Sequence, residues 1–120
     1  MLRELKTNKF VTIFLKRHLQ LIANEFQLKL IDIRVLFYVY VCDKPVIADD
    51  MVEDFLCSKA HISMSIKYLE EMGYIYRTPL ASDKRKLIIK YNHSIMPIIE
   101  RAKQIRDKLI EIALDGIEKE

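Results

Sequence analysis

The stretch that decides the fold runs from Ser58 to Lys90 and reads SKAHISMSIKYLEEMGYIYRTPLASDKRKLIIK. Apolar residues recur in its first half at Ile62, Ile66 and Leu69. Steps of four and three place such residues on one face of an α-helix. Ser58 stands where a helix N-cap is expected, and Gly73 where a left-handed residue ends a helix. The first half therefore predicts a helix with one buried face.

After Gly73 the apolar period shortens to that of β-strands. Tyr74–Thr78 and Lys86–Lys90 are rich in Tyr and Ile, and they flank the segment Pro79–Arg85. Two such runs around a short segment of turn-forming and basic residues predict a β-hairpin with a basic tip. A tip of this kind is suited to reach a phosphate backbone or a minor groove.

A shorter helix is predicted just before Ser58. It covers Ala48–Phe55, and the apolar spacing turns Met51, Val52 and Phe55 inward. Two helices joined by about three residues, the second with polar and basic side chains outward, are typical of a helix-turn-helix. The hairpin that follows would be its wing.

The N-terminal third contains two further apolar segments. Thr7–Gln27 has apolar residues at steps of mostly three and four, which predicts an amphipathic helix. Leu30–Cys42 fits either a strand or a buried helix, and Asp32 as an N-cap favours the helix. Asp43-Lys44-Pro45 then breaks the chain, and Val46–Ile47 is predicted as a very short strand.

The C-terminal segment, from Ser94 to about Gly116, has a heptad seam. Its apolar members are Ile95, Ile98, Ala102, Ile105, Leu109 and Ile112. A seam of nearly three repeats predicts a long helix that packs on its own subunit and also on a second copy. The members expected at the dimer contact are Ile98, Ala102, Ile105, Leu109 and Ile112. Burial within the monomer alone remains an alternative for this seam.

Composition agrees with a small globular protein. The chain has 120 residues, of which 51% are hydrophobic and 31% are charged, and only two are glycine. We expect a mainly α-helical α+β fold over residues 1–120. The DNA-binding module would occupy about residues 30–92, and the segments 1–28 and 94–120 would be dimerisation helices.

Charge is unevenly distributed although the net charge is only +3. Residues 58–91 carry seven Lys or Arg and three acids, whereas residues 43–57 carry one Lys and five acids. A basic segment beside an acidic one suits a surface that meets a polyanion on one side. Ordinary solvated faces would give the same count, so charge is supporting evidence only.

Several classes of protein are disfavoured by what the sequence lacks. Cys42 and Cys57 have no metal-binding spacing, so we expect reduced thiols, no metal and no cofactor. No secretory leader or bilayer-length apolar run is present, which predicts a soluble cytoplasmic protein. Without a phosphate-binding glycine loop, an HExxH motif or a supported catalytic triad, and with three scattered histidines, we expect no enzyme.

Three pieces of the chain together resemble the MarR-type transcriptional regulators, in particular their short, Sar-like branch. They are Ser58-Lys59-Ala60-His61-Ile62-Ser63, Leu69-Glu70-Glu71-Met72-Gly73-Tyr74-Ile75-Tyr76-Arg77 and Ser82-Asp83-Lys84-Arg85. The resemblance extends from about Asp32 through the last helix, and it implies that Leu30–Cys42 is helical. It also implies a homodimer that binds a palindromic operator in double-stranded DNA.

The resemblance assigns residues to the DNA-binding site. The recognition-helix face comprises Ser58, Lys59, Ala60, His61, Ser63, Met64 and Lys67. The wing comprises Asp83, Lys84, Arg85 and Lys86. In the family's Asp-x-Arg pair, the Asp holds the hairpin tip and the Arg is presented to the minor groove. A carboxylate two residues before an Arg can fix the direction of its guanidinium, which suits a narrow, negative groove.

Two departures from the family pattern affect this assignment. Many relatives carry a basic residue where this chain has Met64, which can touch a thymine methyl but cannot bind phosphate. The usual Leu-Thr before the last helix is replaced by Tyr91-Asn92-His93-Ser94, so capping is expected from Asn92 or Ser94. The chain also ends without the additional C-terminal helix of longer members, which leaves the dimer geometry open.

Sequence-specific DNA binding by a homodimer is the favoured function, with a winged-helix module for protein interaction as the alternative. In that alternative the basic hairpin only keeps the surface soluble. Relatives often bind phenolic compounds or respond to oxidants. A small-molecule effector is therefore a hypothesis, with Tyr38 and Tyr40 as candidate pocket residues and Cys42 or Cys57 as candidate redox sensors.

Overall fold

A computed structural model describes residues 16–118, apart from the side chains of residues 109, 113 and 116–118. The described residues divide into two compact units. One unit is Lys29–Met96, and the other consists of the described parts of Met1–Leu28 and Pro97–Glu120.

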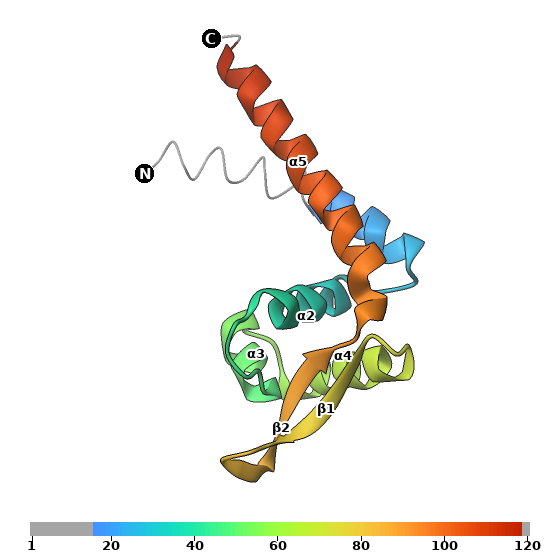
Figure 1. The fold of residues 1–120 in the computed structure, drawn as a ribbon. Helices are drawn as coiled ribbons and strands as arrows, with labels where there is room; N and C mark the ends of the chain where they lie inside the picture. Colours follow the sequence, from blue (N-terminus) through green and yellow to red (C-terminus); the bar gives the residue numbers. More distant parts are fainter. Residues whose placement is uncertain (1–15, 119–120) are drawn as a thin grey trace. The chain divides into compact units, whose positions relative to one another are not determined.

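The Lys29–Met96 unit is a winged helix-turn-helix. Its elements are α2 (Leu30–Val41), α3 (Ala48–Phe55), α4 (Lys59–Glu71), β1 (Ile75–Leu80), β2 (Asp83–Tyr91) and the 3₁₀ helix η1 (His93–Ile95). Fully buried side chains from its helices and strands form one core, among them Ile33, Leu36, Met51, Ile62, Leu69 and Ile75. The hairpin of β1 and β2 extends away from the three helices (Figure 1). The predicted fold class is confirmed.

Helix α2 occupies the segment that fitted either a strand or a helix. Apolar residues on several sides of this helix are buried, and Ile33, Val35 and Leu36 are fully enclosed. This explains why the sequence shows no clear amphipathic period there. The prediction of Asp32 as N-cap was wrong, because the extended residue is Lys29 (φ −95°, ψ 163°). Asp32 lies in the first turn, where its Oδ2 accepts the backbone N–H of Lys29 at 2.8 Å.

The predicted ends of α4 are confirmed. The Ser58 Oγ accepts a hydrogen bond from the backbone N–H of His61 at 3.1 Å, which caps the first turn. At the other end Gly73 adopts φ +80°. Its N–H bonds to the carbonyl of Glu70, and the N–H of Tyr74 bonds to that of Leu69, both at 3.0 Å. This pair of bonds is a Schellman motif, which ends the helix and turns the chain into β1.

The hairpin has longer strands than predicted. β1 and β2 extend to Leu80 and Asp83, which are register partners, so only Ala81 and Ser82 separate them. The expected seven-residue loop Pro79–Arg85 was therefore too long. A register shift between Pro79 and Leu80 accommodates the additional residues of β2 in the sheet. Val46 forms a single antiparallel bridge with Ile89, in place of the expected short strand.

The second unit contains helical segments from both ends of the described chain. Residues 16–25 are helical and residues 26–27 form a turn, while residues 7–15 of the predicted first helix lie outside the described part. α5 (Met96–Glu118) follows η1. Arg101 of α5 pairs with Glu25 at 3.2 Å. Within the described residues, no helix combines the length and apolarity needed to span a membrane.

Candidate nucleic-acid interface

The recognition helix α4 separates a buried face from an exposed one, as predicted. Ile62, Ile66 and Leu69 are at most 2% exposed. All seven residues predicted for DNA contact are exposed: Ser58, Lys59, Ala60, His61, Ser63, Met64 and Lys67. Met64 has two thirds of its surface exposed, and it is the larger of the two apolar side chains in this set. The face therefore offers donors, cations and one methionine to solvent.

Ser65 is the polar residue of α4 that faces inward. Its Oγ donates to Oδ1 of Asp32 at 2.6 Å, and both side chains are buried. This bond ties the middle of α4 to the first turn of α2. Sequence reasoning missed it, because Ser65 and Asp32 lie far apart in the chain and no local pattern pairs them.

The Asp83–Arg85 pair predicted for the wing is present. The Arg85 Nε and Nη2 donate to the two carboxylate oxygens of Asp83 at 3.1 and 3.4 Å, and the Arg85 backbone N–H donates to Oδ1 at 3.1 Å. The side-chain bond from Arg85, followed by the backbone bond, lowers the pKa of the Asp83 carboxyl below its ordinary value. The Arg85 side chain remains 91% exposed. Asp83 thus orients an Arg that is still free to meet a ligand.

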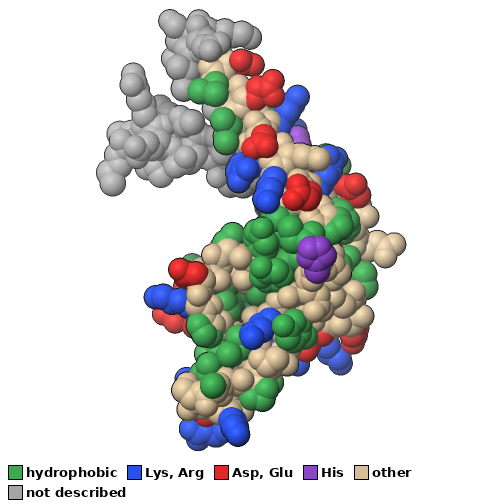
Figure 2. Space-filling model, viewed as in Figure 1, with side chains coloured by type: hydrophobic (Ala, Val, Ile, Leu, Met, Phe, Trp, Pro, Cys, Tyr) green, Lys and Arg blue, Asp and Glu red, His purple; other side chains and the backbone are tan. Residues whose placement is uncertain are grey.

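A basic hollow of about 300 Å³ joins the start of α4 to the wing. Four of the residues that line it are cationic and one is acidic: Lys59, Arg77, Arg85, Lys86 and Asp49. The structure therefore brings together Lys59 of the predicted helix set with Arg85 and Lys86 of the predicted wing set. Lys67 and Lys84 are exposed outside this lining. Lys and Arg side chains also gather at the tip of the hairpin (Figure 2).

Arg77 is a basic residue of the hollow that the predicted site did not include. Its Nη2 and Nε lie 2.8 and 3.1 Å from the carboxylate oxygens of Glu70. The pair joins β1, the first strand of the wing, to the end of α4. The sequence gives no signal for this contact, because it joins the end of a helix to a strand of different period.

Tyr38, a candidate pocket residue, instead connects α2 to α3. Its hydroxyl donates to Oδ2 of Asp54 at 2.5 Å, and its ring meets that of Phe55 edge-on at 5.4 Å. The bond to Asp54 raises the pKa of Tyr38 to about 12. Arg34 stacks over the same Phe55 ring at 4.3 Å. Tyr40 packs against Tyr91 at 5.4 Å.

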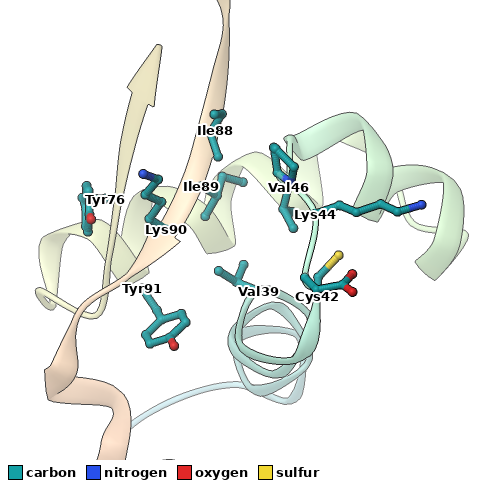
Figure 3. Close-up of a pocket in the computed structure, with 11 residues that line it drawn as sticks. Val39, Cys42, Lys44, Val46, Tyr76, Ile88, Ile89, Lys90 and Tyr91 are labelled. Carbon is teal, nitrogen blue, oxygen red and sulfur yellow. The ribbon is translucent and has the colours of Figure 1, made fainter. Parts of the chain in front are cut away.

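A second hollow, a groove of about 420 Å³, lies on another side of the wing. Figure 3 shows Tyr76, Ile88 and Lys90 of the hairpin on one side and Cys42, Lys44 and Val46 on the other. Val39 and Ile89 lie between them and are almost fully buried. Cys42 and Cys57 are both half-buried free cysteines, and the Cys57 Sγ donates to the carbonyl of Phe55 at 3.5 Å. The groove thus combines an apolar floor with a few polar groups.

The predicted dimerisation residues of α5 differ in exposure. Ile98 and Ile105 are buried within the single chain, Ala102 is half-buried and Ile112 is 39% exposed. The side chain of Leu109 lies outside the described residues. Ile110 and Leu114 are more than half exposed. The described apolar surface of α5 therefore increases toward its C-terminal half.

Solved structures share the fold at low sequence identity. MepR of S. aureus in complex with DNA is 18% identical with a TM-score of 0.75, and the match covers 92% of this chain and 83% of MepR. The transcriptional regulator Tm0710 of Thermotoga maritima is 18% identical with a TM-score of 0.79 and coverages of 98% and 82%. BldR of Sulfolobus solfataricus is 16% identical with a TM-score of 0.67 and coverages of 98% and 92%.

Sequence comparison assigns the family. No curated protein matches the chain. Residues 17–102, which include the whole helix-turn-helix and wing, match the family described as transcriptional regulator SarA/Rot. The resemblance to MarR-type regulators is thereby confirmed. The family and the solved structures that the chain matches are transcriptional regulators and not enzymes. The chain belongs to the SarA/Rot family of winged-helix, MarR-like transcriptional regulators.

Proposed function

We propose that this chain acts in the cytoplasm as a homodimer that binds a palindromic DNA operator with sequence specificity. The observation that carries the proposal is the basic hollow between α4 and the wing. It unites Lys59 at the start of the recognition helix with Arg85 and Lys86 of the wing. Clustered cations of this kind supply the phosphate contacts on which DNA affinity depends.

The two parts of the site would have different tasks on DNA. α4 would enter the major groove, where His61 and Ser63 reach base edges and Met64 meets a thymine methyl. Arg85 would enter the minor groove, directed by Asp83. Four lysines would contact phosphates: Lys59, Lys67, Lys84 and Lys86.

Selection of bound fragments from a random DNA pool tests this proposal. A homodimer places two recognition helices in successive major grooves about 34 Å apart, so the selected fragments should contain an inverted repeat with that spacing. Affinity for the selected fragment should fall with rising salt. A plot of the logarithm of the binding constant against the logarithm of the salt concentration should have a slope of about −0.9 per neutralised phosphate. Weak binding with no preferred fragment would instead favour the protein-interaction module.

The exposed apolar residues of α5 support the homodimer. Ile112 continues the heptad seam of Ile98 and Ile105 and is 39% exposed, whereas Ile110 and Leu114, on the other side of the helix, are 52 and 55% exposed. A second copy that packs along the seam would remove Ile112 from water, and burial of such side chains drives most protein association. Sedimentation of the wild type should give a dimer, and Ile112→Asp should shift the equilibrium toward monomer. A wild-type monomer at micromolar concentration would contradict this part of the proposal.

The groove beside the wing supports a response to a small-molecule effector. Its volume of about 420 Å³ is within the range of about 300 to 1,000 Å³ that is usual for ligand sites. Both strands of the wing contribute to its lining, so an occupant would contact the element that carries Arg85.

Cys42 provides the test, because its thiol lines the groove whereas Cys57 does not. A phenolic compound that releases the protein from DNA should slow alkylation of Cys42 and leave that of Cys57 unchanged. Release without protection of Cys42 would exclude this groove as the effector site.

A further inference from the structure

The chain passes twice between the two compact units of the protein. Near each of these two crossings, side chains form hydrogen bonds to the recognition helix or to the residue that ends it. The chain crosses between the units at Leu28/Lys29 and again at Met96/Pro97. None of these side chains belongs to the exposed face of α4.

The first tether is the carboxylate of Asp32. One oxygen accepts the backbone N–H of Lys29, the first residue of the winged unit, at 2.8 Å. The other accepts the hydroxyl of Ser65 in the middle of α4 at 2.6 Å. Asp32 and Ser65 are each only 3% exposed, so water does not compete for these bonds. One buried group therefore joins the entry of the chain to the recognition helix.

The second tether converges on the carbonyl of Gly73, just beyond the end of α4. It accepts Nδ2 of Asn92 at 2.9 Å and Oγ of Ser94 at 2.7 Å. One of these two side chains, Asn92 or Ser94, was expected to cap the last helix. Asn92 makes no side-chain capping bond at the start of η1, and both side chains bond instead to Gly73. The backbone N–H of Asn92 also donates to the carbonyl of Tyr74 at 2.8 Å. The exit of the chain is thus fastened to the residue just after the C-terminal end of α4.

We propose that Asp32, Asn92 and Ser94 are positioning residues of the DNA site, which set the orientation of α4 from the two chain crossings. A displacement of either crossing is then transmitted to the recognition helix. This inference rests on the proposed function. Side chains that read base edges must be held within about 0.5 Å of their working positions. Loss of a tether should therefore reduce selectivity before it reduces contacts to phosphate.

The test compares two tether variants of the full chain, Ser65→Ala and the double variant Asn92→Ala/Ser94→Ala. Asn24→Ala, at an exposed position of the helical segment 16–25, is the control. Affinities for the preferred fragment and for mixed-sequence DNA are measured at a temperature at which every variant is folded. In Ser65→Ala the ratio of the two should fall at least about fivefold, because a buried oxygen of Asp32 is left without its donor. In the double variant it should fall by a smaller factor, because the Gly73 carbonyl is exposed and can bond to water. Mixed-sequence affinity and its salt slope should stay at the wild-type values.

A tether that only stabilises the fold would lower the melting temperature and leave that ratio unchanged, and this result would overturn the proposal. Amide hydrogen exchange without DNA gives a second readout. Exchange should increase along α4 in both tether variants and stay unchanged at the hairpin tip. Unchanged protection of α4 would also overturn the proposal. The exchange measurement needs no DNA. It therefore still tests whether the tethers hold α4, even if the wild type shows no preferred fragment and the proposed function fails.

Discussion

The recognition helix and the wing are held in different ways. α4 depends on partners in other elements, such as Asp32 of α2 for Ser65 and Arg77 of β1 for Glu70. The wing's Arg85 is oriented by a residue only two positions away. The helix is therefore positioned by the folded unit as a whole, whereas the direction of Arg85 is set locally. Changes at the helix anchors should alter stability and DNA binding together, and changes at Arg85 should alter DNA binding alone.

The largest expected effect is on the buried face of α4. Leu69→Ala should lower the free energy of unfolding by about 2 to 5 kcal/mol, because it leaves a cavity in a fully packed site. Met64→Ala, on the exposed face of the same helix, should change it by less than about 0.5 kcal/mol. Denaturant unfolding measures both. Equal effects would mean that α4 is not packed as described.

A smaller loss is expected at the buried polar anchor. Ser65→Ala leaves one oxygen of Asp32 without its hydrogen-bond donor, which should cost about 1 to 3 kcal/mol in the free energy of unfolding. Ser63→Ala provides the control, because Ser63 is exposed two positions earlier on the same helix. If both variants unfold at the same denaturant concentration, the anchor does not stabilise the fold.

The left-handed end of α4 should contribute somewhat less. Gly73→Ala places a side chain at φ +80°, where the backbone of an L-residue is strained by about 1 to 2 kcal/mol. No atom lies within 4 Å of the added Cβ, so strain rather than a clash should determine the loss. Gly73→Asn should lose less, because Asn tolerates this conformation better. The order would be reversed if the conformation of Gly73 differed from the one described.

The smallest effect concerns the wing, and it appears in a titration. Arg85 lowers the pKa of Asp83 from its ordinary value of 3.8. A lowered folded-state pKa contributes stability above the unfolded value, and this contribution is lost as pH falls through the folded value. NMR titration of the Asp83 carboxyl should show the low pKa in the wild type and a value near 3.8 in Arg85→Ala. An identical pKa in both proteins would mean that Asp83 and Arg85 do not pair in solution.

The same difference explains what could be predicted from the sequence. The Ser58 cap, the turn at Gly73 and the pair of Asp83 with Arg85 are all local, and each was predicted from neighbouring residues. The contacts of Ser65 with Asp32 and of Arg77 with Glu70 were missed, since they depend on how elements pack. Asn92 and Ser94 show the limit most clearly. Their position predicted capping, but the tertiary structure brings the Gly73 carbonyl within their reach.

The affinity of Arg85→Ala for the selected DNA fragment tests the central claim most directly. Lys44→Ala, which removes an exposed cation outside the basic hollow, is its control. Both variants should remain folded at the temperature of the assay. Arg85→Ala should bind the fragment at least about tenfold more weakly at fixed salt, while Lys44→Ala should bind with wild-type affinity. Full affinity in Arg85→Ala would contradict the assignment of the wing to DNA.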